Sequence, residues 1–218
     1  METRGTPEKV VVRPYRPEDR EAVRRLCCDT GDAGLPADSF FPDRELFADL
    51  ITSYYTDHEP ESLWVAELRG RVVGYLTGCL DDGRASRFSA WTVFPKAAWG
   101  ALRRGTVLRP WFLRLILANL FLRRAKALPS ASRRGHLHIN LAPEARGAGA
   151  GRALAEVFLS AAKKAGVAEI GAAVRADNAG GRRFFEAMGF VPARTRVGYR
   201  VPAPAPRTYD VVDYGRRL

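Results

Sequence analysis

The sequence predicts a single α/β domain, spanning residues 1–218, in which helices flank a central sheet. Of its residues, 46% are hydrophobic and 27% charged, which is typical of one globular domain with a sizeable core. Short β-branched or alternating runs predict strands, and segments with helical periodicity lie between them. Late in the chain, a glycine-rich turn at residues 146–151 joins a predicted strand to a predicted helix.

The N-terminal part is predicted to contain three strands and two helices. Asp43 is a suitable N-cap for the second helix, and Arg69-Gly70 has the composition of a tight hairpin turn. In chain order we expect a strand at 10–13, a helix at 19–28, a loop at 30–42, a helix at 44–55, and strands at 63–68 and 72–80.

A basic helical insert is predicted at 83–134, between the third and fourth strands. It contains twelve Lys or Arg and no Asp or Glu, so it carries the whole net charge of +11. Residues 111–122 are apolar except for Arg114 and Asn119. A membrane span needs roughly 20 apolar residues, so this run predicts a buried or groove-facing helix, with an interfacial membrane helix as the alternative.

The C-terminal part is predicted to alternate strands and helices. Polar His136, His138 and Asn140 alternate with apolar residues, which is the pattern of a half-buried strand. In chain order we expect a strand at 136–141, a helix from about 152 to 164, a strand at 170–175, a helix at 178–188, a proline-rich loop at 202–206 and a last strand at 209–214.

The glycine-rich turn has the composition of a phosphate cradle. Glycines let the backbone approach an anion, and the free N–H groups at a helix start point toward it. A tight packing turn would have the same composition. The turn has no Gly-Lys-Ser/Thr, and it lies too late in the chain for a dinucleotide-binding fingerprint, so both of those nucleotide sites are excluded.

Two signatures in the expected order resemble the GCN5-related N-acetyltransferase (GNAT) superfamily. Arg146, Gly149 and Gly151 match the central R/Q-x-x-G-x-G/A motif, and residues 178–190 resemble the second signature, an Asn followed by an aromatic residue, Glu and Gly-Phe. Residues 13–20, 30–32 and 136–140 resemble, more narrowly, bacterial acetyltransferases related to the C-terminal acetyltransferase-like domain of O-GlcNAcase, in which Asp often stands at the position of Asn140. The resemblance implies the GNAT fold, a mixed, mostly antiparallel twisted sheet of about six to seven strands flanked by helices.

The resemblance also implies acetyl-CoA as co-substrate and assigns residues to it. The backbone amides of 147–152 would hold the pyrophosphate, Leu141 and Pro143 would lie along the pantetheine arm, and the Leu141 N–H would polarise the thioester carbonyl. Asn178 is either a cofactor contact or only a helix N-cap. The cofactor-binding set implied in this way is Leu141, Pro143, Arg146, Gly147, Ala148, Gly149, Ala150, Gly151, Arg152, Asn178 and Phe185.

Acetyl transfer to an amine needs a general base that works near neutral pH. His136 and His138 are the best candidates by chemistry, although both would also suit hydrogen-bonded sheet histidines. Asp32, in the 30–42 loop, is a second candidate base, with loop capping as the alternative. Phe185 stands where the superfamily often has a tyrosine that protonates the leaving thiolate, and phenylalanine cannot donate a proton. The function predicted is therefore an acetyltransferase, with a catalytically weak acetyl-CoA-binding or protein-interaction module as the alternative.

The remaining expectations concern partners and location. A small amine or an acidic peptide suits the basic insert better than a lysine-rich acceptor does, because like charges repel. Nucleic acid is less expected, since arginines can simply cover an apolar helix. A homodimer through the apolar insert is left open. The first ten residues contain no secretory pattern and the three cysteines no zinc spacing, so we expect a cytoplasmic protein with reduced thiols and no metal.

Overall fold

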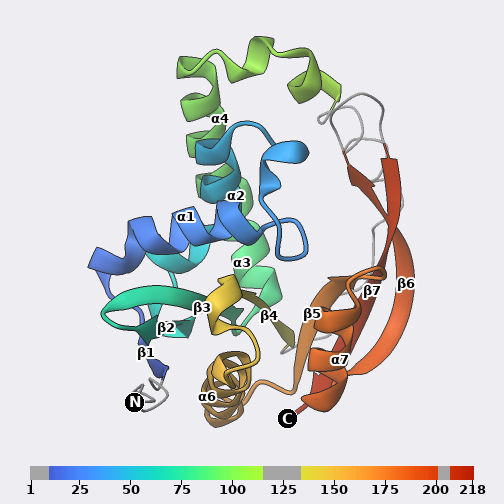
Figure 1. The fold of residues 1–218 in the computed structure, drawn as a ribbon. Helices are drawn as coiled ribbons and strands as arrows, with labels where there is room; N and C mark the ends of the chain where they lie inside the picture. Colours follow the sequence, from blue (N-terminus) through green and yellow to red (C-terminus); the bar gives the residue numbers. More distant parts are fainter. Residues whose placement is uncertain (1–9, 115–133, 201–206) are drawn as a thin grey trace, which may run out of the picture.

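A seven-stranded sheet organises the computed structural model, which describes residues 10–114, 134–200 and 207–218 (Figure 1). The strand order is β1-β2-β3-β4-β5-β7-β6, and every neighbouring pair is antiparallel except the parallel pair β4–β5. The mixed, mostly antiparallel sheet predicted from the resemblance is thus confirmed. The strands are β1 Val11–Pro14, β2 Leu63–Leu68, β3 Arg71–Cys79, β4 Arg134–Leu141, β5 Glu169–Arg175, β6 Val191–Arg200 and β7 Arg207–Arg217.

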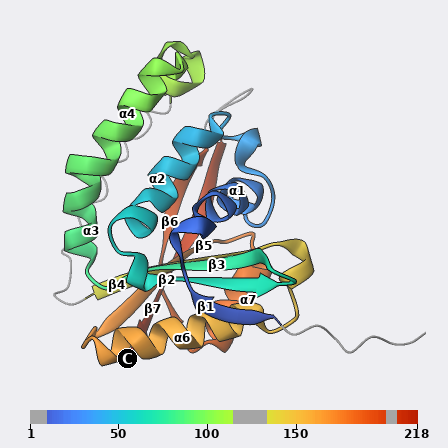
Figure 2. The ribbon, with the colours of Figure 1, turned by 90° about the vertical axis from the view of Figure 1, so that its left-hand side faces the viewer.

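Helices cover both faces of the sheet. Figure 2 shows α1 and α2 on one side of strands β1–β4 and α6 on the other. The predicted cap is present, because Asp43 Oδ1 accepts a hydrogen bond of 2.9 Å from the Leu46 N–H at the start of α2. The helices are α1 Arg20–Thr30, α2 Arg44–Asp57, α3 Asp82–Phe88, α4 Phe94–Arg103, α6 Ala150–Lys164 and α7 Ala179–Ala187.

The core lies between the sheet and these helices. Phe158 of α6 is fully buried against Gly78 of β3, where an added Cβ would come within 1.9 Å of the ring. Only glycine lets the α6 ring approach the strand this closely. All three cysteines are buried and unpaired, as expected for reduced thiols. Burial raises the pKa of the Cys27 thiol to about 12, so this group is inert rather than reactive.

The basic insert is helical where the structure describes it. Between β3 and β4 the chain forms α3, a π-helical turn at Ser89–Val93 and α4, and a further helix starts at Pro110 and is described as far as Arg114. Val93, Ala97 and Ala101 are buried on the side of α4 that packs against α2. Residues 115–122 of the predicted apolar helix lie outside the described residues, and Arg134, assigned to the insert, is the first residue of β4. Among the described helices, none is long and apolar enough to cross a bilayer.

A buried carboxylate joins the insert to the core. Glu59 is fully buried and accepts hydrogen bonds from Tyr54 Oη at 2.5 Å, Ser62 Oγ at 2.7 Å and the Leu80 N–H at 3.0 Å. The guanidinium of Arg84, in α3, donates a fourth at 2.7 Å. Four donors on two oxygens satisfy this buried charge, which is the condition under which burial of a carboxylate is tolerated.

Two elements differ from the sequence prediction. Strand β6 was not predicted; its Pro192 and its arginines are not typical of a strand. The structure places β6 at the edge of the sheet, where a proline costs no ladder hydrogen bond. Helix α6 starts at Ala150 rather than at about residue 152, so the last two residues of the glycine-rich turn form its first turn.

Candidate active site

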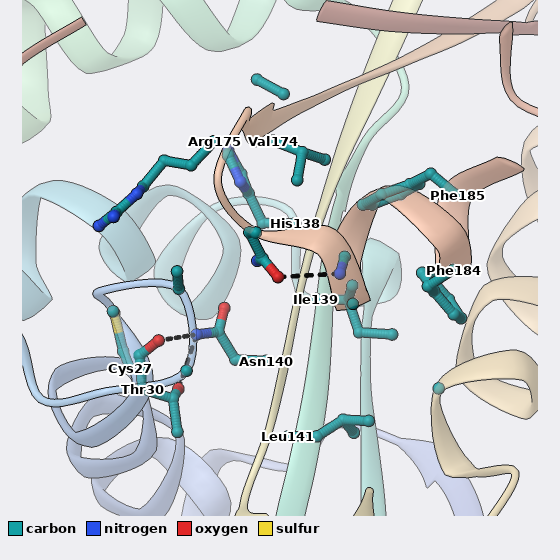
Figure 3. A pocket seen from close by; sticks show the side chains of 18 of the residues that line it. Cys27, Thr30, His138, Ile139, Asn140, Leu141, Val174, Arg175, Phe184 and Phe185 are labelled. Atoms are coloured by element: carbon teal, nitrogen blue, oxygen red, sulfur yellow. Dashed lines mark hydrogen bonds between the residues drawn. The ribbon is translucent and has the colours of Figure 1, made fainter. Parts of the chain in front are cut away.

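The sheet opens between β4 and β5. Only residues 134–136 of β4 pair with residues 169–171 of β5, and beyond His136 the two strands separate. A cavity of about 790 Å³ occupies this opening, and it is lined by β4, β5, α7, the 30–34 loop and the glycine-rich turn (Figure 3). That volume lies in the range of small-molecule and cofactor sites.

Strand β4 presents free backbone groups to the opening. The Ala142 N–H donates to Val73 O of β3 at 2.8 Å. Successive N–H groups of a strand point to opposite sides, so the Leu141 N–H points away from β3, toward the gap left by β5. Parallel strands that separate in this way leave a donor available to a carbonyl oxygen, which is the role that the resemblance implies for Leu141.

The glycine-rich turn has the geometry of an anion cradle. Gly147 and Gly149 have φ angles of +76° and +79°, and an added Cβ at either position would meet no atom within 4 Å. Glycine is therefore required there by backbone conformation, while the space above the turn stays empty. Gly149 is the N-cap of α6, whose first-turn amides have no acceptor within the helix. Ala148 and Arg152 are exposed on the same turn.

The third glycine of the motif serves a different purpose. A Cβ on Gly151 would lie 3.2 Å from Phe184 Cε2 and 3.3 Å from Leu141 Cδ1. This glycine lets α6 approach α7 and the end of β4 at the base of the opening. The cradle and the end of β4 are thereby held against the second signature helix.

Arg146 holds the cradle to its surroundings. Its guanidinium donates to the Leu141 carbonyl at 3.2 Å and to the Gly34 carbonyl at 2.8 Å. Pro143 opens a short 3₁₀ helix at Pro143–Ala145 between β4 and the turn, and it is exposed. Arg146 therefore links the end of the strand with the loop that covers the cavity.

The two predicted histidines lie in different environments. His136 has both ring nitrogens occupied, Nδ1 by Asp82 Oδ1 at 2.5 Å and Nε2 by Tyr55 Oη at 2.6 Å. Because a carboxylate only accepts, Nδ1 carries the proton, and in the neutral ring Nε2 accepts from Tyr55. His136 is thus a hydrogen-bonded sheet histidine, the alternative that its pattern left open.

His138 faces the cavity instead, and its ring is open to it (Figure 3). Desolvation by the surrounding protein atoms and, second, the nearby His136, whose ring centre is 5.7 Å away, together lower the pKa of His138 to about 4. Because the ring is exposed to the cavity, solvent weakens this desolvation, but a lowered pKa still leaves His138 neutral at pH 7. A neutral imidazole facing a cavity is equipped to accept a proton.

Asp32 is engaged across the mouth of the cavity. Its carboxylate pairs with the Arg175 guanidinium at the end of β5, and Arg175 also pairs with Asp177. The start of the 30–34 loop is held by Asn140, whose side-chain amide donates to Thr30 Oγ1 at 2.6 Å and to Thr30 O at 3.2 Å. Asp32 therefore joins the two halves of the sheet through the loop.

The second signature helix lies beside the cavity. Asn178 caps α7 through a 2.9 Å bond from the Gly181 N–H to its Oδ1, and it also lines the cavity. Phe185 is buried, 5.2 Å from the Phe190 ring and 6.2 Å from the Tyr214 ring, measured between centroids. Tyr209 of β7, which was not singled out from the sequence, also lines the cavity, and the Arg175 guanidinium lies 5.5 Å from its ring centre.

A group of three potential metal ligands, also not predicted, lies behind the cavity. Ligand atoms of Cys79, Asp82 and His136 lie within 4.8 Å of one another. Their spacing in the sequence contains no signal of this; they meet because Cys79 of β3 is paired with His136 of β4. Both nitrogens of His136 are already bonded within this network, which accounts for the group without an ion.

The sequence model of the acetyltransferase (GNAT) family matches residues 33–190 of this chain. The chain belongs to this family. Among solved structures, the protein described as SsHAT is 31% identical to it, covers 96% of this chain and 98% of its own, and superposes with a TM-score of 0.74. Two more distant structures share the fold. The ribosomal-protein-alanine N-acetyltransferase of Brucella melitensis is 18% identical, covers 95% of this chain and 99% of its own, and has a TM-score of 0.60. The putative acetyltransferase YncA of Salmonella typhimurium, solved with acetyl-CoA, is 14% identical, covers 96% of this chain and 94% of its own, and has a TM-score of 0.59.

GNAT proteins use acetyl-CoA, and the residues of this chain fit that co-substrate. The cradle combines a helix N-terminus, left-handed glycines and empty space, which suits a pyrophosphate. The unpaired Leu141 N–H faces the adjoining opening, which suits a thioester carbonyl. The lining between them is mostly apolar, as a pantetheine arm requires.

Proposed function

We propose that this protein transfers the acetyl group of acetyl-CoA to an amine. The observation that carries the proposal is the opening between β4 and β5, which has an anion cradle at one end and His138 facing the same cavity. In this proposal the amides of residues 147–152 bind the pyrophosphate, and the Leu141 N–H stabilises the negative charge that develops on the thioester oxygen.

His138 is the general base of this proposal. An amine is protonated in water at neutral pH and must lose a proton before it can attack a thioester. None of the described residues that line the cavity is Asp or Glu, and Cys27 and Tyr75, which also line it, are buried with raised pKa values. His138 is the lining group that is neutral and able to accept the proton, directly or through water.

The acceptor in this proposal is a small amine or an acidic peptide. Among the described residues, three arginines line the cavity, Arg146, Arg175 and Arg196. The charges of Arg175 and Arg196 are partly balanced by Asp32 and Asp213. Apolar Phe40, Phe47 and Ile51 line the side of the 30–34 loop and α2. Such a lining favours an acceptor with an apolar body and an anionic group over a polycation.

A second candidate function is a module that binds acetyl-CoA with weak or no transfer. It is favoured by Phe185, which stands at the usual place of the proton-donating tyrosine. A thiol has a pKa of about 8.5, so a thiolate can leave without an acid, although more slowly. Of the two tyrosines in the described lining of the cavity, Tyr75 is buried and Tyr209 only half-buried, so Tyr209 is the candidate for the proton donor that Phe185 cannot be.

Calorimetric titration with acetyl-CoA, and with CoA for comparison, tests the site. Gly149→Glu places a negative charge and a side chain in the cradle. Gly166→Glu is the matched control, because Gly166 has a similar φ of +74° and equally empty space at the other end of α6. We expect binding to be lost in the first variant and kept in the second. Equal binding by both would disprove the proposed cradle.

A panel of small amines and acidic peptides then separates the two functions. Release of CoA that depends on one of these acceptors supports the acetyltransferase. Binding of acetyl-CoA without turnover of any acceptor favours the binding module.

A further inference from the structure

The insert exposes large apolar side chains along α4 and the turns on either side of it, here called the insert face: Trp91, Phe94, Trp99, Leu102 and Leu108. Trp91 is 84% exposed, Trp99 61%, Leu102 53% and Leu108 85%. Single exposed apolar residues need no explanation, but two tryptophans and two leucines on one short segment form a patch that marks an interaction site.

The fold does not need this face. The opposite side of the same helix already buries Val93, Ala97 and Ala101 against α2, and Thr106 hydrogen-bonds to Asp43 beyond the end of α4. Figure 2 shows α4 on the outer side of α2, away from the sheet. The insert is therefore a helix with two apolar sides, one used by the core and one directed outward.

Positive charge surrounds the insert face. Lys96 and Arg103 lie three residues before and four residues after Trp99, so all three are neighbours on the surface of α4. Arg84 and Arg104 are neutralised by Glu59 and Asp43. In the described part of the insert, residues 83–114, five other exposed basic residues form no ion pair, namely Arg87, Lys96, Arg103, Arg109 and Arg114.

We propose that the insert face binds the surface of an anionic lipid bilayer. A helix with Trp, Phe and Leu on one side and Lys or Arg beside them lies in the membrane interface, where the apolar groups enter the acyl boundary and the cations meet anionic headgroups. The tryptophans are suited to this depth because their rings are amphipathic. The binding is peripheral and does not depend on the acetyl-transfer proposal.

Charge and shape argue against two other occupants. A second copy of the chain would bring the same unpaired cations against one another, and like charges facing each other oppose association. Nucleic acid would satisfy the charge and stack on the tryptophans, but it would leave the aliphatic Leu102 and Leu108 in water, and the exposed side of a helix is convex rather than a groove. An anionic bilayer satisfies both the charge and the aliphatic residues.

Vesicle co-sedimentation tests the proposal with the chain of residues 1–218. The probes are vesicles of phosphatidylcholine alone and vesicles with about a third phosphatidylglycerol. We expect binding to the anionic vesicles only, weakening with salt, together with a blue shift of tryptophan emission. The double variant Lys96→Gln/Arg103→Gln should lower the partition coefficient by roughly 30-fold, because each cation near an anionic surface contributes about a fivefold factor. Trp99→Ser/Leu102→Ser should lower it as well and should reduce the emission shift, because only Trp91 of the two exposed tryptophans remains.

Matched controls keep the test specific. Lys163→Gln/Lys164→Gln removes two exposed cations from α6, and Val191→Ser removes an exposed apolar residue from β6. We expect both to bind vesicles like the wild type, and acetyl-CoA titration shows that every variant is folded. Equal binding to neutral vesicles, or no difference between insert and control variants, would overturn the proposal. The proposal would also be overturned if the wild type bound no vesicles but bound a duplex DNA fragment tightly, which would assign the face to nucleic acid. Concentration-dependent dimerisation that Trp99→Ser/Leu102→Ser abolishes would assign it to a second copy of the chain.

Discussion

Replacement of His138 is the sharpest test of the proposed chemistry. Gln keeps most of the volume and hydrogen-bonding capacity of His but cannot act as a base. Removal of a general base costs about 10² to 10⁴ in rate. Because the pKa of His138 is lowered to about 4, it is a weaker base than an ordinary histidine, and we expect a loss near the lower end, about 10²-fold in kcat.

The pH dependence gives the same residue a second readout. We expect the imidazole signal of His138, followed by NMR, to titrate well below pH 6.5, and the acid limb of kcat/KM to follow it. The lowered pKa of His138 also makes the free energy of unfolding depend on pH. The folded state binds fewer protons than the unfolded state between about pH 4 and 6.5, so His138 makes unfolding easier as the pH falls through that window, and His138→Gln removes this contribution.

His136→Gln is the matched control for this prediction. It breaks the bonds to Asp82 and Tyr55, so we expect a loss of about 1–3 kcal/mol in the free energy of unfolding but a smaller loss of rate than for His138→Gln. Acetyl-CoA affinity should stay unchanged in both. The reasoning is refuted if His138→Gln keeps kcat within about threefold of the wild type while His136→Gln shows the larger loss.

Three further perturbations test the core, the turn and the second half of the reaction. Burial alone would raise the pKa of Glu59, but its hydrogen bonds hold it below the usual value; Glu59→Gln should lower the free energy of unfolding by about 2–3 kcal/mol at pH 7, with a difference from wild type that shrinks in urea titrations below about pH 4.5. Gly149→Ala should cost about 1–2 kcal/mol through its left-handed φ of +79°, and Gly149→Asn less, as thermal denaturation would show. Tyr209→Phe should lower kcat without changing acetyl-CoA affinity if Tyr209 replaces the hydroxyl that Phe185 lacks, and an unchanged kcat would show that the thiolate leaves without an acid.

Local signals in the sequence predicted most of the fold. The Asp43 cap, the hairpin turn after Leu68 and the glycines of the cradle depend only on their near neighbours in the chain, so they could be read directly. The strand that was missed, β6, has the opposite character. Its residues favour solvent, and only pairing with β7 along its length makes it a strand.

Contacts between distant residues were beyond the sequence reasoning. Glu59 meets Arg84, and Asp32 meets Arg175, across 25 and 143 residues of chain. No periodicity encodes such pairs, because each depends on how helices and loops come together on the sheet. The roles of these carboxylates, in holding the insert and the loop over the cavity, are visible only in the structure.

The two histidines show most clearly where sequence reasoning ends. Alternation places His136 and His138 on the same face of β4 and makes them equal candidates. They differ because β4 and β5 are paired as far as His136 and separate after it, while Asp82 and Tyr55 reach His136 alone. The first histidine is consequently enclosed in a hydrogen-bond network, and the second is the first polar side chain of β4 in the opening. Two histidines only two residues apart on one strand thus have different roles, one structural and one as the proposed base. Comparison of His136→Gln with His138→Gln, in rate and in stability, tests this difference directly.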